Sequence, residues 1–184
     1  SVMQAVASNI ESLYQDQGYA FVNVVPQPYP NPTTGQADMV ISIETGRKYR
    51  IGLIAISGND PTVDKVIRRE VQVDEGDIYR GGRLQGSRAR IQRLGFFESV
   101  DMTTPRGLGE DVLDVNFKVK EQPTGSFSAG LGFSNLEQFV LTGSISKNNF
   151  LGMGWMFAAS VNWSAIRRQG QIQFFDPYFL DSRW

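Results

Sequence analysis

The sequence has 184 residues, 41% of them hydrophobic and 20% charged, and its 18 basic residues nearly balance 19 acidic ones. The resulting net charge of −1 gives no overall attraction to nucleic acid or to anionic lipid. Cysteine and histidine are both absent, which excludes thiol nucleophiles, serine–histidine–aspartate triads and nearly all zinc sites. We expect no catalytic residue, no metal and no cofactor.

The first predicted element is an amphipathic helix. Val6, Ile10 and Leu13 are spaced so that they fall on one face of a helix. Gly18 is placed to end it, because glycine adopts a left-handed backbone without strain. The chain opens on Ser1 as if already inside this helix. We therefore expect the natural N-terminus, with any targeting signal, to be missing.

Two strands are predicted after this helix. Residues 20–27 are rich in valine and phenylalanine, which favours a strand. We expect this strand to stop there, at Gln27, because the prolines at 26, 28, 30 and 32 cannot donate ladder hydrogen bonds. After a loop that reaches Gly35, residues 37–45 alternate in polarity and predict a second strand.

Five further elements are predicted in the middle of the chain, in the order strand, helix, helix, strand, strand. The first strand covers 47–57, and a helix begins near Pro61, a residue type suited to a first helical turn. The second helix covers 83–94, the next strand begins at Phe96, and the last strand covers 112–121. Glycines 76, 81 and 82 are expected to break the chain. The residues expected to face inward are Val63, Val66, Ile67, Leu84, Ile91 and Leu94 on the helices and Val115, Phe117 and Val119 on the last strand.

The first 46 residues repeat the last three of these elements. Gly18-Tyr19 corresponds to Gly95-Phe96, and Met39–Glu44 corresponds to Val115–Lys120, at an offset of 76 to 77 residues. This self-similarity predicts one and a half copies of a tandem module.

Polarity alternates from Gly125 to the end of the chain, which predicts strands with one apolar face and one small or polar face. In residues 125–133, the odd positions from Phe127 are apolar and the even positions are serine or glycine. Several such strands of about 10 residues in succession are typical of an outer-membrane β-barrel. The residues expected to face lipid are Phe127, Leu131, Phe139, Leu141, Phe157 and Val161. Those expected to face the lumen are Ser128, Thr142, Ser144, Ser160 and Asn162.

Five blocks of the sequence resemble the BamA family of outer-membrane assembly factors, in which tandem periplasmic POTRA domains precede a transmembrane β-barrel. The blocks are Ile67-Arg-Arg-Glu70, Arg93–Asp101, Val119–Phe127, Asn149–Gly154 and Asp176–Phe179. The resemblance implies α+β POTRA domains of β-α-α-β-β order, followed by antiparallel strands of a truncated outer-membrane β-barrel. Residues 1–46 would be the C-terminal part of one POTRA domain, 47–123 a complete one, and 124–184 the first three to four barrel strands. Residues 1–123 would lie in the periplasm.

The resemblance also implies a function, which is the folding and insertion of β-barrel proteins into the outer membrane. The implied partners are unfolded outer-membrane β-barrel proteins, periplasmic lipoproteins of an assembly complex and outer-membrane lipid, but no nucleic acid. The POTRA strands would receive clients by strand addition. The first barrel strand would template client strands through an open edge made of Ser126, Phe127, Ser128, Ala129, Gly130, Leu131, Gly132 and Phe133. Gly130 and Gly132 fit a weakened strand, or they only make room inside the barrel wall.

Two sets of side chains outside that strand receive predicted roles. In the family, the region around Glu98 approaches a periplasmic lipoprotein, so Glu98 is either a partner contact or a plain exposed charge. A catalytic pair with Asp101 is disfavoured, because residues three apart in a strand point to opposite faces. The aromatic residues at predicted strand ends would form membrane-interface belts, or the core of a soluble sheet. They are Phe150, Trp155, Trp163, Tyr178 and Phe179.

Other interpretations are weaker or remain open. Residues 81–86 lack the Lys-Ser/Thr ending of a phosphate-binding loop. The arginines of the helix at 83–94 suit a solvated face better than a basic patch, because acidic residues lie nearby. A two-partner secretion transporter, which exports one dedicated exoprotein, is the alternative function. A soluble periplasmic binding module that ends in an ordinary sheet is a third.

Overall fold

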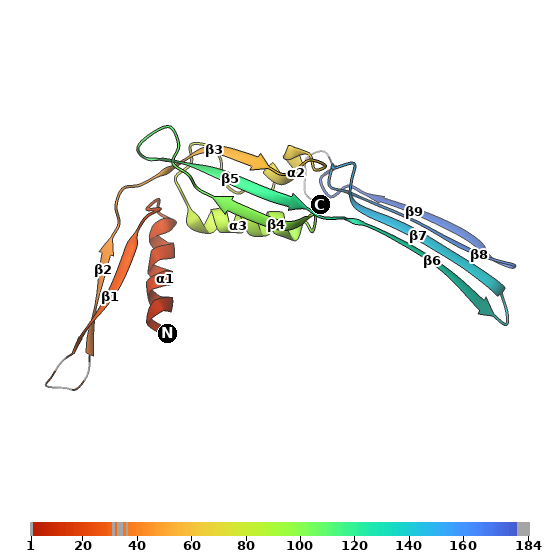
Figure 1. The fold of residues 1–184 in the computed structure, drawn as a ribbon, viewed down its shortest axis with the longest axis horizontal. Coiled ribbons are helices and arrows are strands. Elements are labelled where there is room, and N and C mark those ends of the chain that lie inside the picture. Colours follow the sequence, from red (N-terminus) through yellow and green to blue (C-terminus); the bar gives the residue numbers. More distant parts are fainter. Residues whose placement is uncertain (1, 31, 33–34, 36, 180–184) are drawn as a thin grey trace. The chain divides into compact units, whose positions relative to one another are not determined.

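The computed structural model describes residues 2–30, 32, 35 and 37–179. Part of the predicted loop before Gly35, and the last five residues of the predicted membrane segment, lie outside the described residues. The chain forms two compact units. The first contains residues up to 57, 70–91 and 101–118, and the second contains 58–69, 92–100 and 119 onward. The order of the elements follows the colours of Figure 1.

The first unit begins with helix α1 (Val2–Gln15) and the strands β1 (Asn23–Pro30) and β2 (Ala37–Glu44). The strands pair antiparallel, with Asn23 opposite Glu44 and Pro30 opposite Ala37. Gly18 lies in the turn after α1 with a φ of 105°, the left-handed conformation for which glycine is suited. The predicted helix and the two strands are therefore confirmed.

Strand β1 continues through three prolines to Pro30, so the prediction that the prolines stop it at Gln27 was wrong. Pro26, Pro28 and Pro30 occupy alternate positions, and their missing N–H groups therefore all fall on one edge of the strand. Among the described residues β1 pairs only with β2, so the residues between the prolines can supply the whole ladder. The prediction failed because it ignored which edge each N–H group faces.

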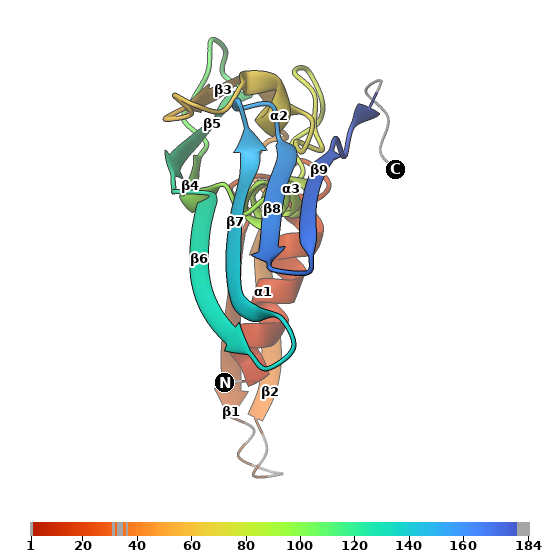
Figure 2. The same ribbon diagram turned by 90° about the vertical axis from the view of Figure 1, so that its right-hand side faces the viewer.

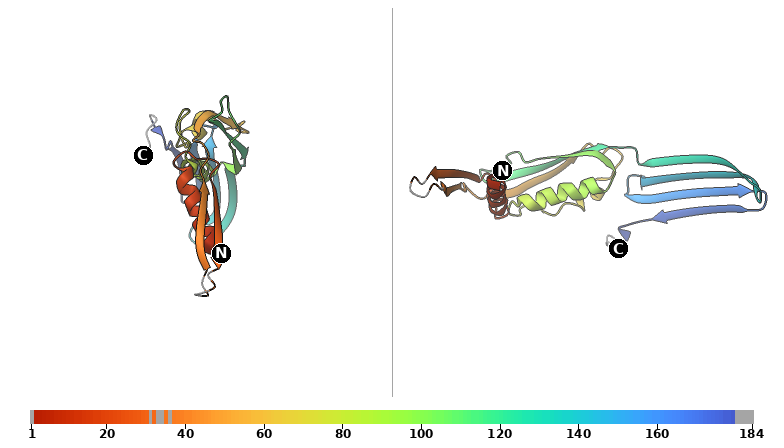
Figure 3. Two further views of the ribbon diagram at one scale, coloured as in Figure 1. Left: turned by 90° about the vertical axis from the view of Figure 1, so that its left-hand side faces the viewer. Right: turned by 90° about the horizontal axis from the view of Figure 1, so that it is seen from below.

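Strand β3 (Arg50–Ser57), helices α2 (Asp64–Arg68) and α3 (Gly81–Arg93), and strands β4 (Phe97–Thr103) and β5 (Val112–Glu121) confirm the predicted β-α-α-β-β order. The three strands form one sheet in the order β3-β5-β4, with β3 parallel to β5. Figure 3 shows α3 alongside this sheet. None of the helices within the described residues is long and apolar enough to cross a lipid bilayer.

The core predicted from helix and strand spacing is buried. Leu84 and Ile91 of α3, and Val115 and Phe117 of β5, have no solvent-exposed surface. Side chains two apart in a strand share a face, which is why Val115 and Phe117 are buried together. Val66, Ile67 and Val119 are also buried, whereas Leu94 is only half-buried.

Two local predictions in this region were wrong. Val63 was expected to face inward, but it precedes α2 with an extended backbone and is 43% exposed. Gly81 and Gly82 were expected to break the chain, but they form the first turn of α3. The Gly82 N–H donates to the Asp16 carboxylate at 2.7 Å. This contact satisfies one of the amides that a helix start leaves without an intrahelical partner.

The second unit contains four more strands, β6 (Gly125–Ser134), β7 (Gln138–Phe150), β8 (Trp155–Ser164) and β9 (Arg168–Phe175). They form an antiparallel sheet in sequence order, which Figure 2 shows face on. The alternating pattern after Gly125 is therefore confirmed as strands.

Candidate functional site

The register of the β6–β9 sheet separates an apolar face from a polar one. Residues directly opposite each other in antiparallel strands share a face. Leu131 lies opposite Leu141, and Leu141 lies opposite Trp163. On the other face, Ser144 lies opposite both Ser128 and Ser160. This register puts the predicted lipid-facing and lumen-facing residues on opposite faces of the sheet.

Strand β6 forms one edge of this sheet and contains all eight residues of the predicted client-strand edge. Within the part of the chain that the structure describes, β6 pairs only with β7. The segment before β6 is β5, which belongs to another sheet. A strand that pairs with the second edge of β6 must therefore come from beyond the described residues or from another protein.

The polar face of β6 is hydrogen-bonded to β7 through hydroxyl groups. The Ser126 and Ser146 oxygens lie 2.7 Å apart, and those of Ser128 and Ser144 lie 2.6 Å apart. These short pairs tie β6 to β7 in addition to the backbone ladder, and no side chain of this β6 face between 126 and 132 is larger than serine.

The two glycines on this face are not equivalent. A Cβ at Gly130 would come within 2.8 Å of the Thr142 hydroxyl oxygen, so the threonine uses the space that a side chain would fill. A Cβ at Gly132 would meet nothing closer than 3.9 Å. Room for a neighbouring side chain explains Gly130 but not Gly132.

The predicted belt aromatics lie at the strand ends. Phe150 ends β7, stacks on Phe157 with ring centroids 5.3 Å apart, and lies opposite Trp155 at the start of β8. Trp163 lies toward the other end of β8, where the Arg168 guanidinium is 4.9 Å from its ring centroid. Trp155 and Trp163 are eight positions apart, about 27 Å along the strand at a rise of about 3.4 Å per residue. A strand tilt of about 40° reduces this to a height of about 20 Å, which is of the order of the roughly 25 Å apolar band of a barrel. Their role as a membrane belt stays a prediction, as does that of Phe179, which is 56% exposed.

Tyr178 has a different environment from the other belt candidates. Its ring is covered by the Arg69 guanidinium at 3.7 Å from the centroid, a cation–π contact. Tyr178 is half-buried, and Asp176 accepts its backbone N–H at 2.9 Å. The Asp-Pro-Tyr segment after β9 therefore contacts the end of the segment that contains α2.

Glu98, the predicted partner contact, lies on β4 and pairs with Lys120 of β5. The Lys120 amine and the Glu98 carboxylate are 2.7 Å apart, and their side chains are 67% and 59% exposed. An ion pair this exposed contributes at most about 1 kcal/mol, so Glu98 can exchange its partner at small cost.

A polar junction that the sequence did not predict joins the loop before α2 (residues 59–63) to the end of β7 and the turn that follows it (residues 149–154). The Asn149 side-chain amide donates to the Thr62 hydroxyl at 2.6 Å. The Asn149 side-chain oxygen accepts the Gly154 N–H at 2.9 Å. The Val63 N–H donates to the Gly152 carbonyl at 2.9 Å. We call these two segments together the junction.

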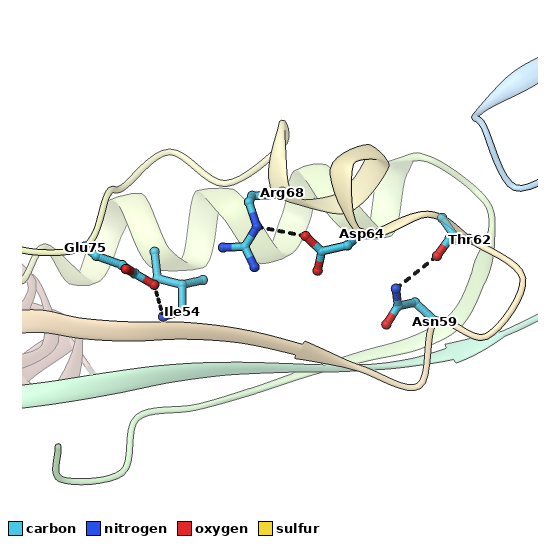
Figure 4. Close-up of polar contacts among 6 residues, drawn as sticks. All are labelled: Ile54, Asn59, Thr62, Asp64, Arg68 and Glu75. Carbon is cyan, nitrogen blue, oxygen red and sulfur yellow. Dashed lines mark hydrogen bonds and ion pairs between the residues drawn. The ribbon is translucent and has the colours of Figure 1, made fainter.

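Further hydrogen bonds fix the loop side of the junction. The Thr62 carbonyl accepts the Asn59 side-chain amide at 2.9 Å, as Figure 4 shows, and the Thr62 N–H donates to the Glu121 carboxylate at 3.0 Å. Both Thr62 and Asn149 are buried, with 2% and 6% of their surface exposed. In the sequence, only the block Asn149–Gly154, which resembles the BamA family, drew attention to the junction. Thr62 lies 87 positions before Asn149, and no local pattern connects the two residues.

Strand β3 has a blocked edge. On the side away from β5, the Ile51 N–H donates to the Asp77 carbonyl and its carbonyl accepts the Gly76 N–H, both at 2.8 Å. The Ile54 N–H donates to the Glu75 carboxylate at 3.0 Å, which is visible in Figure 4. A client strand cannot add along this part of β3 without displacing residues 75–77.

Comparison with known proteins identifies both parts of the chain. Residues 49–122 match the family described as POTRA, surface antigen variable number repeat. The chain is 34% identical to outer membrane protein assembly factor BamA of Neisseria meningitidis serogroup B and 31% identical to that of Nitratidesulfovibrio vulgaris. These alignments cover 96% and 98% of this chain but 22% and 23% of the relatives, so the chain spans about a fifth of their length.

The fold agrees with the sequence comparison. The crystal structure of BamA from Haemophilus ducreyi lacking POTRA domains 1–3 superposes with a TM-score of 0.86 at 27% identity. The match covers 96% of this chain and 34% of that one. The chain belongs to the BamA family, and its fold is α+β POTRA structure followed by antiparallel strands of an outer-membrane β-barrel. Its location is therefore the outer membrane, with the POTRA structure in the periplasm. The domain boundaries at 46 and 123 stay predictions.

Proposed function

We propose that the protein folds and inserts β-barrel proteins into the outer membrane, and that β6 templates the incoming client strand. The edge position of β6 carries this proposal. When a strand enters lipid, each unpaired backbone N–H or C=O group costs several kcal/mol of free energy. A strand edge that is already in place can form hydrogen bonds with these groups. The relatives named above, described as outer membrane protein assembly factors, support this activity.

The structure of β6 suits a template of low sequence selectivity. Its ladder offers backbone groups, which every client shares. Its polar face carries only serine and glycine between 126 and 132, so a client strand meets no bulky side chain there. The hydroxyl pairs with β7 hold β6 in the sheet while its second edge exchanges partners.

Cysteine crosslinking during assembly tests the template. The 184 residues contain no cysteine, so an introduced thiol is unique within them. We expect the full-length protein with Ser128→Cys to form a disulfide with a cysteine in the terminal strand of a client. The matched control is Ser144→Cys, the register partner of Ser128 on β7 and on the same face. It should crosslink poorly, because it lies one strand farther away, beyond the roughly 4 Å Cβ separation of a disulfide. Equal crosslinking at both sites, or none at either, would contradict the proposal.

The POTRA sheet is the second proposed client site. Strand addition needs an edge, and residues 75–77 already occupy much of one edge through β3. We therefore assign client strands to β4, which forms the opposite edge of the sheet.

Glu98 is the proposed contact for a periplasmic lipoprotein of the assembly complex. Because the side chain is 59% exposed, Glu98→Lys should preserve the fold while it reverses the charge offered to a partner. The measurement is co-purification of lipoproteins with the full-length protein, and Lys120→Glu is the control that perturbs the same ion pair. Unchanged co-purification with Glu98→Lys would make Glu98 an ordinary surface charge.

A further inference from the structure

We propose that Asn149 and Thr62 are positioning residues, which attach the β6–β7 hairpin to the loop before α2, and that client insertion depends on this attachment. The inference rests on the proposed function, because it assigns to the junction the task of holding the template strand in place.

The side-chain contacts of the junction are specific, buried hydrogen bonds. The Asn149 amide uses both of its ends, donating to Thr62 at 2.6 Å and accepting from Gly154 at 2.9 Å. Both partners of the first bond are at least nine-tenths buried. A buried polar group that loses its partner keeps the full cost of its desolvation, so either deletion alone should open the junction.

The backbone of the turn is shaped to make the same contact. Asn149 has a φ of 56°, a left-handed conformation that asparagine tolerates better than most residues. Gly152 has a φ of 72°, and a Cβ there would overlap the Pro61 carbonyl oxygen. The turn therefore approaches the loop more closely than any side chain at 152 would allow, and the bond from Val63 to Gly152 closes the contact.

The junction connects directly to the template strand. Asn148, the neighbour of Asn149, donates its N–H to the Thr124 carbonyl at 3.0 Å, and its carbonyl accepts the Thr124 hydroxyl at 2.5 Å. Thr124 immediately precedes β6. The junction thus fixes the start of β6 and the end of β7 together. A strand held in its binding conformation before the client arrives loses less conformational freedom when the client pairs with it.

Four variants distinguish the effect of losing the attachment from the effect of a general loss of stability. Thr62→Val keeps the shape of the side chain but removes the hydroxyl, and Asn149→Gly removes the amide while preserving access to the left-handed backbone. Thr62→Ser restores the hydroxyl and should behave as wild type. Asn135→Gly makes the same change as Asn149→Gly at an exposed position in the β6–β7 turn and should also behave as wild type.

The experiment measures two properties of the full-length protein reconstituted in lipid vesicles. Hydrogen exchange at the Val63 and Gly154 amides reports the junction, and the initial rate of client insertion reports the function. In Thr62→Val and Asn149→Gly, we expect exchange at both amides to accelerate about tenfold, the factor that corresponds to about 1.4 kcal/mol. We expect insertion to slow severalfold while the β3–β5 amides exchange as before. The double variant should be no worse than the poorer single one, because the Thr62 hydroxyl has already lost its partner in Asn149→Gly and its removal leaves no further buried group unsatisfied.

The outcomes are distinct. Unchanged exchange at Val63 and Gly154 in both variants would overturn the junction as an attachment. Accelerated exchange with unchanged insertion would overturn its positioning role. Failure of the wild-type protein to insert any client would instead overturn the proposed function, and the exchange measurement would still decide whether the junction holds.

Discussion

At the scale of single residues, the stability of the POTRA structure depends on side chains whose environment follows from their position in a helix or strand. Ile91 lies on α3 with no exposed surface, two positions from the exposed Arg93. The two side chains differ in burial because residues two apart on a helix point in different directions.

Ile91→Ala should lower the free energy of unfolding by about 2–5 kcal/mol, because it removes buried methyl groups and leaves a cavity. Arg93→Ala should change it by no more than about 0.5 kcal/mol. Pulse proteolysis of the full-length protein across a urea series gives the unfolding midpoint of the POTRA structure for each variant. Equal midpoints for the two variants would contradict the assigned core.

Tyr79 carries a second residue-scale prediction, on pH. Burial foremost, and then the negative charge of Asp16, raise the pKa of the Tyr79 phenol above its ordinary value. Because the folded-state pKa is the higher one, this group's contribution to stability is complete below a pH of about 10 and is lost as the pH rises through the folded pKa. The difference in tyrosinate absorbance between wild type and Tyr79→Phe should therefore titrate above pH 10 or so. A midpoint below that value would contradict the shift.

At the scale of elements, the periodicity of the sequence was sufficient for most strands and helices. Strand β5 was predicted with both of its bounds, because Val115, Phe117 and Val119 alternate with polar residues. The same rule located the sheet from β6 to β9 and its two faces. Predictions from local patterns failed where the structure depends on a contact with another segment. At Pro26 it depends on which edge of β1 pairs with β2. At Gly82 the Asp16 carboxylate accepts an N–H group that has no partner within the helix.

The junction could not be predicted from the sequence for the same reason. Asn149 carries no local signal for burial, and its hydroxyl partner at Thr62 is far away in the chain. The strand that contains the eight residues of the predicted template edge could be predicted, because their polarity alternates; their templating role stays a prediction. The edge of β3 is occupied because residues 75–77 return to it and form hydrogen bonds with it. The periodicity of the sequence gives no sign of this contact.

The two faces of the β6–β9 sheet provide an element-scale test. Leu141 and Thr142 are adjacent and point to opposite faces. Leu141→Arg should cost about 2–4 kcal/mol if the apolar face meets the lipid midplane, whereas Thr142→Arg should cost far less. Gly130 lies opposite Thr142 and leaves room for the longer side chain. Resistance of the full-length protein to urea extraction from membranes measures assembly. Equal losses, or a greater loss for Thr142→Arg, would mean that the apolar face is not the lipid face.

At the scale of the whole molecule, the chain combines a periplasmic POTRA structure with the strands of an outer-membrane sheet. We assign the reception of clients to the first and the templating of their strands to the second. The proposed assembly factor would act through backbone hydrogen bonds, which all β-barrel clients offer. It should therefore serve many unrelated clients, whereas a two-partner secretion transporter serves one exoprotein.

Depletion of the full-length protein from cells tests this central claim most directly. The measurement is the amount of several unrelated outer-membrane β-barrel proteins that remain folded, scored by urea-resistant membrane insertion, with a plasmid copy of the wild-type protein as the control. We predict that these unrelated proteins all decline together and recover with the plasmid copy. Loss of a single secreted protein, with the β-barrel proteins unaffected, would contradict it.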